Sequence, residues 1–171
     1  LNVLIAMAGI MLPENLRDPA FVETAERTVE TNLLGPIRLI AAFEPHLEAQ
    51  PSAAILTVSS GLAYVPLPAT PTYSATKAAI HSFTESLRVQ LADTSVQVIE
   101  IVPPAVQTTL MGQQDSPHAL PLEAYLDETM QLLEAQPDAP QVLVEGVKVL
   151  RNAPADGTYP QVLAALSTRQ N

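Results

Sequence analysis

The 171-residue sequence has a globular composition, because hydrophobic residues make up 47% of it and charged residues only 15%. The formal net charge of -10, from 18 acidic and 8 basic side chains, provides no basic surface for phosphates and argues against a nucleic-acid or anionic-membrane partner. The sequence has no cysteine, which excludes disulfides, thiolate metal sites and a cysteine nucleophile and fits a reducing, cytoplasmic location. We treat residues 1–171 as a single domain, long enough to bury a sizeable core.

The first half of the sequence predicts a strand followed by a long helix. Residues 1–12, LNVLIAMAGIML, are too short to span a bilayer and lack the basic start of a signal peptide. We interpret residues 1–6 as a strand that is covered on both faces. Helical periodicity then runs from about Phe21 to Ala49, and Gly35-Pro36 within it predicts a kink or a helix in two parts.

The rest of the sequence alternates strands with helices. AAILTVSS (53–60) and VQVIEIV (96–102) are apolar, β-branched strands, and the helix predicted between them starts near Thr72, which we expect to cap it. An amphipathic helix follows around residues 122–133, and a further helix is predicted for about 141–150. The tail after Asn152 gives only a weak pattern. This alternation predicts an α/β protein with a parallel sheet.

The segment PTYSATKAAIHSF (71–83) places Tyr73 four residues before Lys77, a spacing that brings both side chains to one helix face. A nearby cation favours the phenolate and lowers the phenol pKa from about 10 toward the range useful for proton transfer. Taken alone, a packed tyrosine beside a solvated lysine is the simpler explanation of so short a match. Ser60 adds weight to the chemical interpretation, because it ends a parallel strand, where ligands bind. Its hydroxyl can hold a carbonyl oxygen while Tyr73 exchanges the proton.

Three features of the sequence belong together: a strand that ends in Ser59-Ser60, the segment YSATK, whose Tyr73 follows Ser60 by thirteen residues, and a later strand that is followed by PPAVQT. Up to about Thr109, they resemble the short-chain dehydrogenase/reductase family. The resemblance implies a doubly wound, Rossmann-like sheet, NAD or NADP as cofactor, and hydride transfer between an alcohol and a carbonyl of a small molecule. It implies that Ser60 orients the substrate oxygen, that Tyr73 is the acid/base, and that Lys77 lowers the tyrosine pKa and binds the nicotinamide ribose. Asn32, in TNLLG, matches the asparagine that supports a water-mediated proton relay.

The resemblance also implies cofactor contacts outside this tetrad. Ala8 and Gly9 match the end of the family's NNAG segment, although Ala6 and Met7 replace its asparagines. Pro103-Pro104 replaces the family's Pro-Gly, and Thr108 matches a threonine that touches the nicotinamide end of the cofactor. The predicted cofactor-binding residues are therefore Ala8, Gly9, Tyr73, Lys77 and Thr108.

The six glycines contain no G-x-G-x-x-G arrangement of the kind that receives a pyrophosphate. Relative to the family, the sequence looks truncated before its fourth strand, and we expect the 171 residues alone to be inactive and to bind neither dinucleotide. Residues 1–6 would then form an unpaired apolar edge that favours self-association, and a homo-oligomer is expected.

Two loops at strand ends, 62–68 and 110–122, are expected to wall the substrate site. Leu62, Tyr64, Leu110 and Met111 make these walls apolar and favour a hydrophobic carbonyl or secondary alcohol, although packing of the loops explains them equally well. The three histidines lack metal-ligand spacing, so no metal site is predicted. A non-catalytic α/β interaction module without the cofactor half remains the alternative function. A serine hydrolase is disfavoured because TVSSG lacks the first glycine of a nucleophile elbow.

Overall fold

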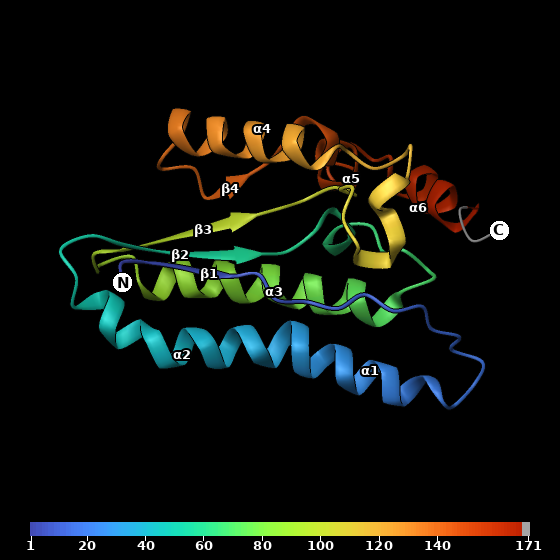
Figure 1. Cartoon of the computed structure of the whole chain (residues 1–171), viewed down its shortest axis with the longest axis horizontal. Helices are drawn as coiled ribbons and strands as arrows, with labels where there is room; N and C mark the ends of the chain where they lie inside the picture. Colours follow the sequence, from blue (N-terminus) through green and yellow to red (C-terminus); the bar gives the residue numbers. More distant parts are fainter. Residues whose placement is uncertain (169–171) are drawn as a thin grey trace.

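The fold is that of a computed structural model of the protein, and the structure describes residues 1–168. Its centre is a four-stranded parallel sheet in the order β1-β2-β3-β4, and the arrows in Figure 1 all point the same way. The strands are β1 (Val3–Ala6), β2 (Ala53–Val58), β3 (Val96–Ile101) and β4 (Gln141–Val142). This confirms the predicted α/β, Rossmann-like class.

Helices cover the sheet on both sides (Figure 1), with α2 and α3 against one face and α4 against the other. The α-helices are α1 (Phe21–Val29), α2 (Gly35–Glu48), α3 (Pro71–Gln90), α4 (Leu122–Ala135), α5 (Lys148–Arg151) and α6 (Tyr159–Ser167). Shorter turns are the π-helical η1 (Glu30–Leu34) and the 3-10 segments η2 (Gly61–Ala63), η3 (Leu110–Asp115) and η4 (Glu145–Val147). Within residues 1–168, every helix is too short or too polar to cross a bilayer.

Two apolar clusters hold the layers together, because the side chains of a strand alternate between the two faces of the sheet. Ile55 and Val98 face α2 and α3, where they pack with Ile40 and Leu47. Their strand neighbours point the other way, and this second cluster contains Leu56, Ile99, Ile101 and Val142 with Leu132 and Leu133 of α4. The central strands are thus buried on both faces, as is usual for a parallel sheet.

The edge strand β1 is covered on one face only, and the prediction that both of its faces are covered is wrong. Leu4 and Ala6 are buried against α2, whereas Val3 and Ile5 on the opposite face are 45% and 50% exposed. The reason is geometric: α4 packs over β2, β3 and β4, and β1 lies at the far side of the sheet with β2 as its neighbour.

The long N-terminal helix is built in two parts, as predicted. Pro36 has no N–H to donate to the carbonyl of Asn32 four residues before it, so one bond of the regular α-helical pattern is missing here. The chain instead widens into the π-helical turn η1 directly before α2. The N–H of Gly35 bonds to the carbonyl of Glu30, which is the five-residue spacing of a π turn.

Two local predictions are wrong. Residues 141–150 do not form one helix, because Gln141 and Val142 pair with β3 as a short strand and only Lys148–Arg151 is α-helical. Thr72 does not cap α3, since the helix already starts at Pro71. The N–H of Thr72 is instead bound by the carboxylate of Glu14, at 2.8 Å. The weakly patterned tail forms α6, whose apolar side chains pack around Val65.

Candidate active site

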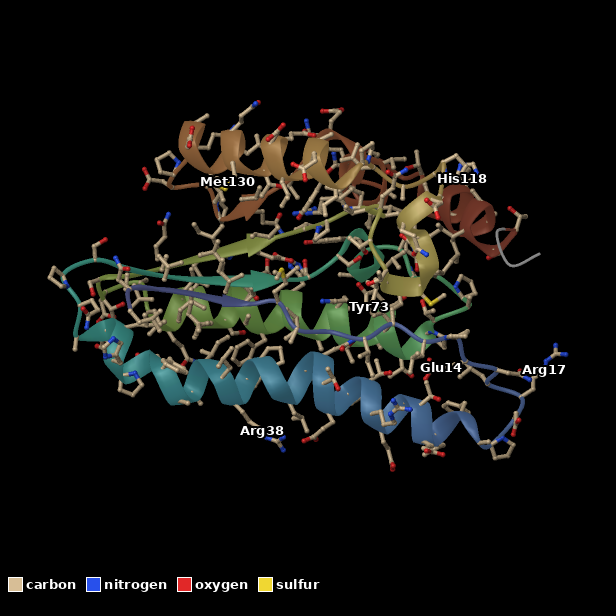
Figure 2. The ribbon with its side chains drawn as sticks, in the orientation of Figure 1. Glu14, Arg17, Arg38, Tyr73, His118 and Met130 are labelled. Carbon is tan, nitrogen blue, oxygen red and sulfur yellow. The ribbon has the colours of Figure 1, made fainter. Side chains whose placement is uncertain are left out.

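The predicted catalytic residues lie at the carboxyl ends of the strands. Gly9 follows β1, Ser60 follows β2, and Tyr73 and Lys77 occupy the first two turns of α3, which packs beneath these strands. Figure 2 shows Tyr73 on α3 at the side toward which the strand arrows point. Sequence segments far apart are therefore brought together here, as expected for a ligand site in a parallel α/β sheet.

Lys77 is buried at the centre of this group. Its Nζ donates a hydrogen bond to the carbonyl of Val58 at 2.8 Å and lies 5.6 Å from the centroid of the Tyr73 ring. A Cβ added to Gly9 would lie 3.8 Å from this Nζ, so the backbone after β1 passes close to the ammonium group. Burial disfavours the charged form and lowers the pKa of Lys77 to about 8.

The pKa of Tyr73 moves in the opposite direction from our expectation. Burial of the ring raises it, and the Ser60 side chain, as a hydrogen-bond partner, lowers it only in part. The predicted net lowering by Lys77 is wrong for this structure, because the phenol is buried and the ammonium is directed to the Val58 carbonyl. The protonated phenol is therefore the favoured form of Tyr73.

Asn32 lies in the π turn η1 and is almost completely buried. Its Oδ1 accepts from the N–H of Ile10 and its Nδ2 donates to the carbonyl of Ile10, each at 2.8 Å. A longer contact of 3.4 Å joins Nδ2 to the hydroxyl of Thr76, the residue before Lys77. Asn32 thus fixes the segment after β1 against the start of α3.

Ser60 begins the 3-10 turn η2 in an extended conformation. Its Oγ accepts a hydrogen bond from the N–H of Leu62 at 3.1 Å, and the residue is 7% exposed. The neighbouring Ser59 is also buried, but its hydroxyl donates to the carboxylate of Glu100 instead. The two serines therefore have separate partners, and Ser60 is the one whose side chain lowers the pKa of Tyr73.

The other predicted cofactor and substrate residues differ in their surroundings. Ala8 is exposed, and Thr108 is half-buried with its hydroxyl accepting from the N–H of Leu110 at 3.3 Å. Leu110 and Met111 are each more than one third exposed, and Met111 has a left-handed φ of 55°, which is rare for a residue with a side chain.

Leu62 and Tyr64 make their contacts mainly inside the protein. Leu62 packs against the cluster that contains Val65, and the Tyr64 hydroxyl accepts from Nε2 of Gln141 at 2.8 Å. Burial and the carboxylate of Glu100 raise the pKa of Tyr64 to about 12.

Two carboxylates that support the site were not predicted from the sequence. Glu100, fully buried in β3, accepts from Ser59, and its signal was the single charged residue in the strand VQVIEI. Glu14 binds the N–H of Thr72 at the start of α3, but the two residues are 58 positions apart and nothing local indicates the contact. Among the described residues, no group of histidines and carboxylates is arranged to hold a metal ion.

Comparison with known proteins identifies a family that the chain resembles. The family model described as short chain dehydrogenase matches residues 1–119. The chain is 39% identical over 177 residues to the uncharacterised oxidoreductase DltE of Bacillus subtilis (strain 168), a match that covers 100% of the chain and 69% of DltE. It is 34% identical over 115 residues to the uncharacterised oxidoreductase SSP0419 of Staphylococcus saprophyticus, covering 67% of the chain and 49% of that protein.

Solved structures agree with this assignment. A short chain dehydrogenase from Burkholderia cenocepacia J2315 in complex with NADP superposes with a TM-score of 0.82 at 27% identity, over 97% of this chain and 70% of that one. The 3-ketoacyl-(acyl-carrier-protein) reductase of Brucella melitensis, complexed with NADH, gives a TM-score of 0.67 at 28% identity, over 85% and 63% of the two chains. The chain therefore belongs to the short-chain dehydrogenase/reductase family of oxidoreductases.

Proposed function

We propose that the protein interconverts an alcohol and a carbonyl with NAD or NADP as the cofactor. The observation that carries this proposal is the meeting of Ser60, Tyr73 and Lys77 at the carboxyl ends of β1 and β2. A buried phenol beside a serine hydroxyl suits proton exchange with a substrate oxygen. Related proteins that are solved with NADP or NADH support the choice of cofactor.

The residues present fit the nicotinamide end of a dinucleotide. The Lys77 ammonium has three hydrogens, and the structure gives one of them a protein acceptor, the Val58 carbonyl. Gly9 carries no side chain, and its exposed backbone passes beside Asn32 and Lys77. We propose that Lys77 and the backbone at Ala8 and Gly9 hold this end, together with Thr108.

The dinucleotide, when bound, supplies or accepts the hydride. The Ser60 hydroxyl donates a hydrogen bond to the substrate oxygen and so orients the carbonyl carbon. During reduction Tyr73 gives its phenolic proton to that oxygen, so that the carbonyl gains one hydride at carbon and one proton at oxygen and becomes the alcohol. During oxidation the alcohol loses both, and Tyr73 takes the proton back. Burial keeps Tyr73 protonated, which prepares it to act as the acid.

Tyr73→Phe tests the proposal, because it keeps the ring and removes only the phenolic proton. We expect kcat to fall by a factor of about 10²–10⁴, the usual contribution of a general acid, with dinucleotide affinity and melting temperature unchanged. Tyr125→Phe is the matched control, since it removes a half-buried phenol on α4 and should leave kcat unchanged. Near-normal turnover by Tyr73→Phe would refute the assignment. A wild-type protein that neither binds a dinucleotide nor turns over any alcohol or carbonyl would favour the interaction module.

For the substrate we propose a hydrophobic carbonyl or secondary alcohol. Leu110 and Met111 are apolar and exposed in η3, the segment that follows Thr108. Leu62 and Tyr64 contribute less, because they pack inside the protein. A panel of aliphatic and aromatic ketones against small charged sugars and acids tests this. Turnover of the charged compounds alone would contradict it.

The matches to this chain span 69% of DltE and about half of SSP0419, so the activity of the whole protein is a proposal. For the 171 residues alone we propose no measurable affinity for NAD or NADP, because the sequence has no glycine-rich turn for the pyrophosphate. Calorimetric titration with each dinucleotide tests this, and micromolar binding would contradict it.

A further inference from the structure

Glu100 is a carboxylate buried inside the sheet, with an exposed fraction of 0%. Three side chains bind it: the hydroxyl of Ser59, Nδ1 of His81 at 2.9 Å and Nε2 of Gln141 at 2.6 Å. An ionised carboxylate only accepts hydrogen bonds, so this set of donors matches it. A buried charge without such partners would strongly destabilise the fold, which makes the arrangement a specific one.

The donors connect the end of β2 with the C-terminal part of the chain. Ser59 follows β2 and His81 belongs to α3, whereas Gln141 starts β4. Arg151 of α5 extends the network, because its Nε and Nη2 donate to Oε1 of Gln141 at 3.0 and 2.9 Å. Gln141 and Arg151 lie outside residues 1–119, the part that matches the family model.

The same network surrounds the residue before Ser60. Because Ser59 and Ser60 are consecutive, the position of Ser59 determines where the backbone of Ser60 leaves the sheet. On the other side of Ser60, the N–H of Gly61 binds the carbonyl of Pro103 at 2.9 Å. A Cβ on Gly61 would lie 2.7 Å from Cδ1 of Leu150, so α5 contacts the turn directly. The contacts of Ser59 with Glu100 and of Gly61 with Pro103 thus fix the backbone that carries the Ser60 hydroxyl.

We propose that Glu100 is a positioning residue, which acts through Ser59 to hold the turn that presents the Ser60 hydroxyl to the substrate oxygen. This inference rests on the proposed function. Glu100 is fully buried and so does not reach the substrate, and Lys77 is held by a different contact, the Val58 carbonyl. Its loss therefore lowers kcat and leaves dinucleotide affinity unchanged.

Glu100→Gln in the full-length protein is the test. It keeps the size of the side chain but turns one acceptor into a donor that faces other donors. We expect kcat to fall about tenfold, because small displacements of a reacting group are costly. Ser59→Ala should give a similar fall, and the double variant should fall no further, as for two residues that act as one unit. Glu85→Gln is the matched control: this exposed carboxylate lies 3.8 Å from the other ring nitrogen of His81 and should leave kcat unchanged.

Amide hydrogen exchange gives a readout that does not need turnover. The N–H of Leu62 is bound to the Ser60 Oγ, so its exchange should accelerate in Glu100→Gln and Ser59→Ala but not in Glu85→Gln. Unchanged kcat and unchanged Leu62 exchange in both variants, or losses that simply add, would overturn the proposal. If Glu100→Gln does not fold, Ser59→Ala decides alone, since it leaves Glu100 bound to His81 and Gln141. If Tyr73→Phe keeps full activity, only the proposed function fails, and the exchange of Leu62 still decides this inference.

Discussion

Lys77→Met should make the stability of the protein less dependent on pH. Burial lowers the pKa of Lys77 from 10.5 to about 8 in the folded state. Below pH 8 the folded state must carry a buried charge that the unfolded chain carries in water, and this cost disappears between pH 8 and 10.5 as the folded protein loses the proton first. Stability therefore rises with pH in that window, by about 1.4 kcal/mol per pH unit and about 3 kcal/mol in all.

Methionine has a similar length and no charge, so it removes the cost at low pH together with the hydrogen bond to Val58. That bond is worth about 1 kcal/mol. We therefore expect Lys77→Met to exceed the wild type in stability by about 2 kcal/mol at pH 7, and the difference to vanish before pH 10. Urea unfolding at pH 7, 8, 9 and 10 measures both curves.

The window should stop at pH 10, because the raised pKa of Tyr73 and Tyr64 means that the unfolded chain then loses tyrosine protons first, which lowers stability. Lys148→Met is the control, since Lys148 is the other lysine of the sequence and lies at the surface beside Glu145. It should leave the rise between pH 8 and 10 in place. Parallel stability curves for the wild type and Lys77→Met would refute a lowered pKa at Lys77.

Substitutions at three further positions test contacts around the site. Asn32→Ala leaves the backbone N–H and C=O of Ile10 without their side-chain partner, and we expect a loss of about 1–3 kcal/mol in urea unfolding; an unchanged midpoint would contradict this. Gly61→Ala places a methyl 2.9 Å from Cγ2 of Val147 and should cost about 1–3 kcal/mol, measured by thermal unfolding, unless the turn moves freely. Glu14→Ala removes the acceptor at the start of α3 and should cost about 1 kcal/mol, whereas Glu14→Gln keeps an acceptor oxygen and most of the stability.

The strands and long helices were predictable because their signals are local. The runs at β2 and β3 are apolar and β-branched, and such residues fit a buried sheet wherever it forms. β4 was not predictable, since it consists of Gln141 and Val142 and exists because β3 offers it backbone partners. A two-residue strand carries no periodicity of its own.

The candidate site was predictable in its composition and not in its electrostatics. The spacing of Ser60, Tyr73 and Lys77 locates the group, since the topology of a parallel sheet brings these positions together. Whether charge or burial dominates the Tyr73 pKa depends on how tightly the ring is enclosed, which only the packed structure shows. The contact of Glu14 with the start of α3 was not predictable either, because it joins residues 58 positions apart.

The π-helical turn η1 has a consequence for insertions and deletions in this gene. A π turn amounts to one extra residue in an α-helix, and here it lets α1 contact α3 while α2 covers β1 and β2. Because the turn takes up one extra residue, deleting one codon within Glu30–Leu34 would give a regular helix whose two halves keep nearly their present orientation, whereas a one-residue change elsewhere in the helix would rotate one half by about 100° relative to the other. Asn32 lies inside the turn, so the deletion would remove it or move its amide away from Ile10. The length of η1 therefore matters chiefly for the position of Asn32.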